Sequence, residues 1–169
     1  STATFRMHEG AWKVRQESTY PEDGRSVFTV EKAPAAGELE LALYVAPWVD
    51  RKRITGISAW DDNWALVRLP AAIGATINVE LPFGLRRHPG MGEMSASHIS
   101  FRHGPLLLGM ANDPRSKPIR GLPKPLGGAR YQASDGSLLG PLGDATWLPE
   151  EACKKSVYKV LFAAEEQPS

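Results

Sequence analysis

What the sequence has little of narrows the classes of protein to which it can belong. Cys153 is the only cysteine among 169 residues, which excludes an internal disulfide framework and a zinc site built from several thiolates. No apolar run approaches the roughly 18 residues of a membrane-spanning helix, and no signal peptide is visible. The formal net charge of +1 gives no strong field to attract nucleic acid or an acidic membrane surface. The sequence therefore predicts no nucleic-acid, membrane or metal partner.

The common motifs of catalysis and cofactor binding are missing as well. The sequence contains no Gly-rich phosphate loop, no His-Glu-x-x-His and no Gly-x-Ser-x-Gly. A glycosidase needs two carboxyl groups that face each other across a sugar, roughly 5–9.5 Å apart. The acidic pairs here are only sequence neighbours: Asp61-Asp62, Glu150-Glu151 and Glu165-Glu166. We therefore expect no catalytic residue and no cofactor in this chain.

Short segments of alternating hydrophobicity fill most of the chain, separated by 14 prolines and 16 glycines. Alternate apolar residues lie on one side of a strand, which is how an antiparallel sheet covers a core. The candidate strands are WKVRQ, RSVFTV, LELALYV, NWALVRL, TINVELP, HISFRH, ARYQA and SVYKVLF. We expect an all-β fold, an antiparallel, jelly-roll-like β-sandwich that forms a single domain over residues 1–169. The one helical candidate is PEEACKK at 149–155, with a proline first, acids early and lysines late.

The segment 112–130 differs from the rest in composition. It contains five basic residues, Arg115, Lys117, Arg120, Lys124 and Arg130, and no acid after Asp113. Its four prolines and three glycines predict a long surface loop without regular structure. A basic loop can hold a phosphate or an acidic sugar, but the composition favours a solvated excursion that packs on a neighbouring domain.

The stretch HISFRHGPLLLGMA at 98–111 combines histidines with an apolar run. On a strand His98 and His103 point to opposite faces, which does not suit one metal. We expect Ile99, Phe101 and His103 to point inward, a bend at Gly104-Pro105, and Leu106, Leu107 and Leu108 to fill the core. The stretch is therefore predicted to be structural. An enzyme that used these histidines would require His88, His98 or His103 to converge with a carboxylate.

The five tryptophans are the remaining candidates for a binding role. Trp48 and Trp60 lie in the segment APWVDRKRITGISAWDD, where an exposed ring could stack on a sugar face. Trp12, Trp64 and Trp147 are expected to fill the space between sheets, as large aromatic residues usually do.

The order of these segments resembles the β-sandwich region that follows the catalytic α/α barrel in the β-L-arabinofuranosidase family of glycoside hydrolases. The first matching segment contains Gln16, Glu17, Thr19, Tyr20, Pro21 and Gly24. The later matching segments are LELALYVAPW, NWALVRL, INVELPFGLRR, RHGPLLLG and YKVLF. The chain departs from the family pattern where RKRITGIS replaces a Val-Asn-Gly hairpin, where Gly74-Ala75 replaces Gly-Asp, and where Trp48 directly follows Pro47. The resemblance implies that the acid/base glutamate and the zinc-bound cysteine nucleophile belong to the barrel upstream, so no catalytic residue is carried over.

The function expected from these observations is that of a non-catalytic accessory domain of a bacterial glycoside hydrolase acting on plant-type, arabinofuranosyl-like glycans. Its partner would be the catalytic α/α barrel, held by the arginines of two turns, Arg51, Arg53, Arg86 and Arg87, which are expected at sheet ends. The alternative is an independent carbohydrate-binding module that binds an oligosaccharide through Trp48 and Trp60. We expect the chain to be part of a longer protein, secreted or periplasmic rather than cytoplasmic.

Overall fold

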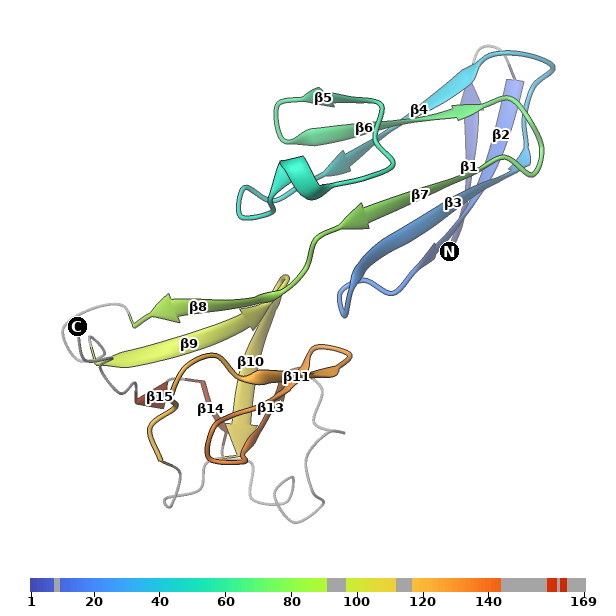
Figure 1. Ribbon diagram of the computed structural model, residues 1–169. Coiled ribbons are helices and arrows are strands. Elements are labelled where there is room, and N and C mark those ends of the chain that lie inside the picture. The colour runs from blue at the N-terminus through green and yellow to red at the C-terminus, as the bar shows by residue number, and fades with distance from the viewer. Residues whose placement is uncertain (8–9, 91–96, 112–116, 144–157, 161, 164–169) are drawn as a thin grey trace. The chain divides into compact units, whose positions relative to one another are not determined.

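The computed structural model describes residues 1–7, 10–90, 97–111, 117–143, 158–160 and 162–163, and every strand pairing among them is antiparallel (Figure 1). The predicted all-β antiparallel fold is confirmed. In this described part the helical element is one 3-10 turn, η1 (Arg51–Arg53), and no helix is long and apolar enough to cross a membrane. The short helix predicted at 149–155 lies outside the described residues.

The chain divides into two compact units, Ser1–Phe83 and Gly84–Ser169. The expectation of one jelly-roll-like domain over 1–169 concerns how the units combine, and it stays a prediction.

The first unit contains two sheets. Sheet one has the strand order β1-β2-β3-β7, and sheet two has the order β4-β6-β5. The strands of sheet one are β1 (Thr2–Met7), β2 (Gly10–Ser18), β3 (Gly24–Lys32) and β7 (Thr76–Leu81). Those of sheet two are β4 (Glu38–Tyr44), β5 (Ala59–Asp61) and β6 (Trp64–Pro70).

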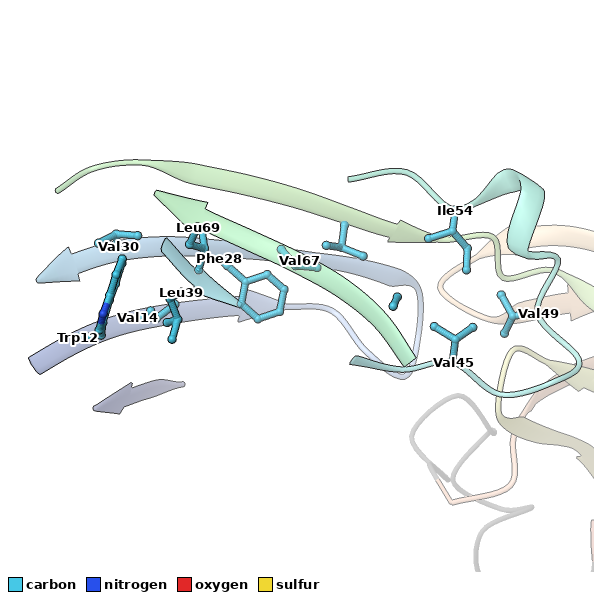
Figure 2. Packing of buried hydrophobic residues seen from close by; sticks show 12 residues of the cluster. Trp12, Val14, Phe28, Val30, Leu39, Val45, Val49, Ile54, Val67 and Leu69 are labelled. Carbon is cyan, nitrogen blue, oxygen red and sulfur yellow. The ribbon is translucent and has the colours of Figure 1, made fainter. Parts of the chain in front are cut away.

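The core of this unit lies between the two sheets, as the alternating pattern predicted (Figure 2). Sheet one contributes Trp12, Val14, Phe28, Val30 and Val79, and sheet two contributes Leu39, Ala65, Val67 and Leu69. Val45, Val49 and Ile54, on the segment that connects β4 to β5, extend the same cluster at one end. Two sheets that bury one face each against the other form a β-sandwich.

The segment after η1 closes one side of this sandwich. Thr55 forms an antiparallel bridge with Glu80 of β7, with both backbone N–H···O distances at 3.3 Å. The chain can approach β7 so closely because Gly56 follows with φ of 78°. A Cβ on that glycine would lie 1.8 Å from the carbonyl oxygen of Asn78, so no other residue fits without a shift of the backbone.

The second unit is built around β9 (His98–His103) and β10 (Leu106–Ala111). Its sheet has the order β11-β12-β13-β10-β9-β15, with β8 paired to β9 and β14 paired to β10. The other strands are β8 (Leu85–Pro89), β11 (Lys124–Gly127), β12 (Arg130–Gln132), β13 (Leu138–Pro141), β14 (Tyr158–Lys159) and β15 (Phe162–Ala163). A separate core cluster contains Ile99, Phe101, Leu108, Met110, Ile119, Tyr131, Ala133, Leu139 and Phe162.

The stretch at 98–111 is the central hairpin of this unit, so its structural interpretation is confirmed. Gly104 and Pro105 form the two-residue turn between β9 and β10, and Gly104 has φ of 51°, which glycine adopts without strain. Ile99 and Phe101 are buried. The expectation for the three leucines was partly wrong: Leu108 is fully buried, whereas Leu106 and Leu107 are half-buried. The register places Leu107 beside the exposed Arg102, on the face opposite to Leu108, and Leu106 beside the half-buried His103.

The predicted loop at 112–130 is wrong in its second half. Residues 124–132 form the β11–β12 hairpin, and Ile119 is buried in the core cluster of the second unit. Pro125 lies in β11, the edge strand of the sheet order, which is where proline is tolerated in a sheet. Residues 112–116, with Arg115, lie outside the described residues. The other basic side chains, Lys117, Arg120, Lys124 and Arg130, are exposed, as predicted.

Candidate functional site

Trp60, a predicted sugar-stacking residue, is half-buried and packs against the core of the first unit. The guanidinium carbon of Arg51 lies 4.7 Å from the centroid of the ring, a cation–π contact. Arg51 also donates a hydrogen bond to Oδ1 of Asn63. The turn that positions Arg51 is capped by Asp50, which accepts a hydrogen bond from the N–H of Lys52 at 3.1 Å. A sugar could stack on this face of Trp60 only by displacing Arg51.

Trp48, the second predicted stacking residue, is 38% exposed and belongs to an aromatic trio. Its ring centroid lies 5.7 Å from that of Phe83, and the Phe83 centroid lies 5.9 Å from that of Tyr20. The rings are tilted by 44° and 59°, so they form no common plane. Tyr20 and Trp48 come from the β2–β3 turn and from the segment after β4, and the fold brings them to the same aromatic cluster.

A further aromatic pair, in which both rings are exposed, was not predicted. Tyr44 and Trp64 are directly opposite in the β4–β6 register, 58% and 45% exposed, with ring centroids 5.5 Å apart and an edge-on angle of 69°. The expectation that Trp64 fills the space between sheets was wrong, because Ala65, Val67 and Leu69 occupy the inner face of β6 and Trp64 has the opposite parity. Trp12 is buried between the sheets as expected, and Trp147 lies outside the described residues.

A groove of about 630 Å³ lies between the two sheets of the first unit. A second groove of about 400 Å³ shares Ser1, Gln16, Phe28, Ala42 and Leu43 with it, so the two form one trough along β4. Apolar side chains from both sheets line the trough, and Tyr20 and Tyr44 flank it. This trough and the exposed aromatic residues beside it are the candidate site of the chain.

The polar groups in the trough are mainly hydroxyl and amide groups. Ser26 Oγ and Ser18 Oγ are 2.9 Å apart, and Ser18 Oγ also donates to the carbonyl oxygen of Arg25 at 3.1 Å. Gln16 Oε1 accepts a hydrogen bond from the Ser1 hydroxyl at 3.5 Å. Glu40 lines the narrower groove and forms an exposed ion pair with Arg68 at 3.1 Å. Such a lining suits a ligand that is neutral or weakly basic and presents both apolar and hydrogen-bonding groups.

The predicted docking arginines occupy different kinds of position. Arg51 and Arg53 lie on η1, between strands, as expected, and Arg53 is exposed. Arg86 and Arg87 were expected in a loop at a sheet end, and this was wrong, because both lie within β8, opposite Arg102 and Phe101. Arg87 is exposed, whereas Arg86 is half-buried and donates to the carbonyl oxygen of Gly104 at 2.7 Å.

Two positively charged side chains, Arg86 of β8 and Arg102 of β9, are directly opposite in the register of these strands. Burial lowers the pKa of Arg86, and the nearby charge of Arg102 lowers it further. Burial also lowers the pKa of His88, and the charges of Arg86 and Arg102 act in the same direction. These shifts arise from basic neighbours and lost hydration, and they describe a strand pairing that is electrostatically costly.

The histidines do not assemble a catalytic site among the described residues. His103 Nδ1 lies 2.6 Å from the hydroxyl oxygen of Tyr131, whose pKa is raised by burial, so His103 is hydrogen-bonded within the sheet. His98 Nδ1 lies 3.3 Å from the hydroxyl of its neighbour Ser97. In the described part of the chain, no group of three or more His, Cys, Asp or Glu residues could hold a metal ion. Cys153 lies outside that part.

Comparison with known proteins relates the fold to that of larger enzymes. No family model matches the chain, and no curated protein matches it in sequence. A solved GH127 β-L-arabinofuranosidase from Geobacillus stearothermophilus T6 matches 73% of this chain with a TM-score of 0.56 at 18% identity. A solved GH127 β-arabinofuranosidase matches 97% with a TM-score of 0.65 at 13% identity, and a further structure titled glycoside hydrolase matches 82% with a TM-score of 0.54 at 18% identity.

The chain spans only 21%, 33% and 25% of the lengths of these three solved chains, in the same order. The described residues thus have the fold of one part of larger glycoside hydrolases. The resemblance expected from the sequence, to the β-sandwich region of β-L-arabinofuranosidases, is confirmed at the level of the fold.

Proposed function

We propose that this chain is a non-catalytic accessory region of a larger bacterial glycoside hydrolase that acts on plant-type, arabinofuranosyl-like glycans. The observation that carries the proposal is the extent of the structural match. Up to 97% of this chain is covered, but at most 33% of a solved β-arabinofuranosidase or glycoside hydrolase chain. A fold shared with one third of an enzyme fits a region that supports the catalytic part and does not replace it.

The chemistry of the described residues supports the same proposal. His103 is held by Tyr131, and Glu40 by Arg68, so both side chains have structural partners. Exposed arginines on η1 and β8, Arg53 and Arg87, provide cations for a polar interface with a catalytic barrel. Bridges of this kind between domains are screened over about 10 Å at 0.1 M salt.

The first test is activity. The purified chain should hydrolyse no aryl β-L-arabinofuranoside, because hydrolysis needs a positioned pair of carboxyl groups or an activated nucleophile. Progress curves with enzyme at high concentration would measure this directly. Turnover that is lost in a Cys153→Ala or a His103→Ala variant would contradict the accessory role.

The second test is association. A catalytic α/α-barrel domain supplied separately should bind the chain, and the affinity should decrease with salt because exposed charges contribute to the interface. Arg53→Ala and Arg87→Ala should weaken this binding, whereas Lys124→Ala, an exposed cation on β11, serves as the control. Isothermal titration at two ionic strengths would measure both effects, and no binding at either would contradict docking.

A second candidate function, a carbohydrate-binding module, rests on one observation. Exposed rings of Tyr20, Tyr44 and Trp48 lie on or close to a trough lined by hydroxyl and amide groups. Titration with arabinan- or xylan-type oligosaccharides should then quench tryptophan fluorescence, with little dependence on salt. The tilted ring pairs offer no flat platform, so the accessory role remains the first proposal.

A further inference from the structure

The backbone of β4 has one hydrogen-bonded side and one free side. Val45 N–H donates to the carbonyl oxygen of Asn63 at 2.8 Å, so these opposite residues form a hydrogen-bonded pair. In an antiparallel ladder such pairs alternate with non-hydrogen-bonded ones. Three pairs are therefore not hydrogen-bonded to each other: Tyr44 with Trp64, Ala42 with Leu66, and Glu40 with Arg68. The N–H and C=O groups of the three β4 residues point away from β6.

The hydrogen bonds of β6 agree with this alternation of bonded and non-bonded pairs. The carbonyl oxygen of Leu66 accepts a hydrogen bond from Ser58 N–H at 2.7 Å, on the β5 side of β6. Leu66 therefore makes its backbone bonds toward β5, and Ala65 and Val67 make theirs toward β4. In the described part of the chain no residue pairs with the outward backbone groups of Glu40, Ala42 and Tyr44.

The trough lies directly along this free edge. Glu40 and Ala42 line the narrower groove, and Ala42 and Tyr44 line the wider one. The opposite wall comes from the inner face of sheet one, from Ala3 of β1 and from Val14 and Gln16 of β2. Sheet one has four strands and sheet two has three, and Ala3 of the edge strand β1 is exposed, whereas its register partner Val14 is buried in the core.

The edge of β7, on the other side of the sandwich, differs from the edge of β4. There the Thr55–Glu80 bridge occupies the edge of β7 at one residue pair, and Gly56 lies against the backbone of Asn78. The β4 side has no such segment among the described residues, yet it offers a full row of backbone donors and acceptors. An exposed edge of this kind is the template for adding a strand.

We propose that the β4 edge binds an extended peptide segment, which completes sheet two as a fourth strand and fills the trough with its inward side chains. The proposal rests on the proposed function, because the segment would come from the rest of the larger polypeptide, and the solved relatives are three to five times as long as their matched parts.

The residues of β4 determine which side chains the added segment should have. The inward positions of the segment lie beside Leu39, Leu41 and Leu43 of β4, so they should be apolar. Its outward positions lie beside Glu38 and Glu40, so basic or small polar residues fit there. Seven residues match the length of β4, at about 3.4 Å per residue.

A designed probe tests the proposal with the chain as it is. The probe is a fluorescein-labelled peptide, Thr-Val-Thr-Val-Lys-Val-Lys, which in antiparallel register places its valines inward and its lysines beside the glutamates. It should bind saturably with a dissociation constant below about 1 mM, measured by fluorescence anisotropy. In ¹⁵N NMR spectra the amide signals of Glu40, Ala42 and Tyr44 should shift, while that of Val67 should not.

Two controls isolate the backbone contribution. A peptide with N-methyl groups on the third and fifth residues keeps its side chains but loses two edge-facing donors, and it should bind at least tenfold more weakly. Ala42→Pro removes the outward N–H of the protein and should weaken binding equally, whereas Ala36→Pro, in the exposed loop before β4, should not. If Ala42→Pro does not fold, the N-methylated peptide with the unmodified chain decides.

The remaining outcomes identify other occupants and each overturns the proposal. No saturable binding up to about 1 mM peptide would reject strand addition. Equal affinity for the N-methylated peptide would show that only side chains are recognised. Shifts of the same amides on addition of arabino-oligosaccharide, or on raising the protein concentration alone, would assign the trough to a sugar or to a second copy. Hydrolysis by the chain would refute the proposed function and leave this titration unaffected.

Discussion

Replacing Gly56 with alanine should destabilise the first unit through two additive effects. The residue has φ of 78°, and a left-handed backbone costs an L-residue about 1–2 kcal/mol. The new Cβ would also lie 1.8 Å from the Asn78 carbonyl oxygen and 2.7 Å from its carbonyl carbon, both of which are backbone atoms of β7. Shifting packed backbone costs about 1–3 kcal/mol more. The free energy of unfolding should therefore decrease by roughly 2–5 kcal/mol.

Gly74 is the matched control, because it has a similar φ of 85° but nothing within 4 Å of a Cβ. Gly74→Ala should cost only the backbone part, about 1–2 kcal/mol. Urea unfolding followed by tryptophan fluorescence suits the comparison, because four of the five tryptophans belong to the first unit. The two midpoints should differ on the order of 1 M urea. Equal midpoints would show that the Thr55–Glu80 contact does not hold the segment against β7.

Two further predictions concern the second unit. Leu108→Ala should lower the free energy of unfolding by about 2–5 kcal/mol because Leu108 is fully buried, and Leu107→Ala should lower it clearly less because that side chain is half-buried. Chemical denaturation monitored by circular dichroism would measure both effects. The reverse order would mean that the hairpin register is wrong. The lowered pKa of His88 means that the folded state disfavours its protonation, whereas the unfolded chain binds the proton at a pKa of about 6.5. The contribution of His88 to stability is therefore fully present above about pH 6.5 and is lost as the pH falls below that value. Midpoints between pH 7.5 and pH 5 should therefore decrease less for His88→Gln than for the unmodified chain, and identical slopes would contradict the shift.

The strands of the first unit could be predicted because their environments are simple. In β4 and β6 one face is apolar and the other contains Glu40 and Arg68, so the period of two is visible in the sequence. The same reasoning could have corrected Trp64, since its parity differs from that of Ala65 and Val67. Its size suggested burial, but in a strand the register decides which face a side chain occupies.

Other elements could not be predicted from local pattern. β8 begins with a leucine followed by two arginines and a histidine, and it forms a strand because β9 beside it provides backbone partners. The β11–β12 hairpin contains Pro125 and three residues with positive φ, Gly127, Gly128 and Ala129, which composition alone associates with loops. The trough depends on which edge of a sheet stays uncovered, and that is a property of the tertiary arrangement.

The two core clusters have no residue in common, and this has a consequence for how the chain opens in solution. Amide hydrogens exchange with solvent through cooperative openings, and each opening usually involves one packed cluster. The amides of Val67 and Leu69 should therefore share one exchange rate regime, and those of Phe101 and Leu108 another. The protection of an amide from exchange would then depend on the unit to which it belongs and not on the length of its strand. One unit of the molecule could lose its hydrogen bonds while the other keeps them.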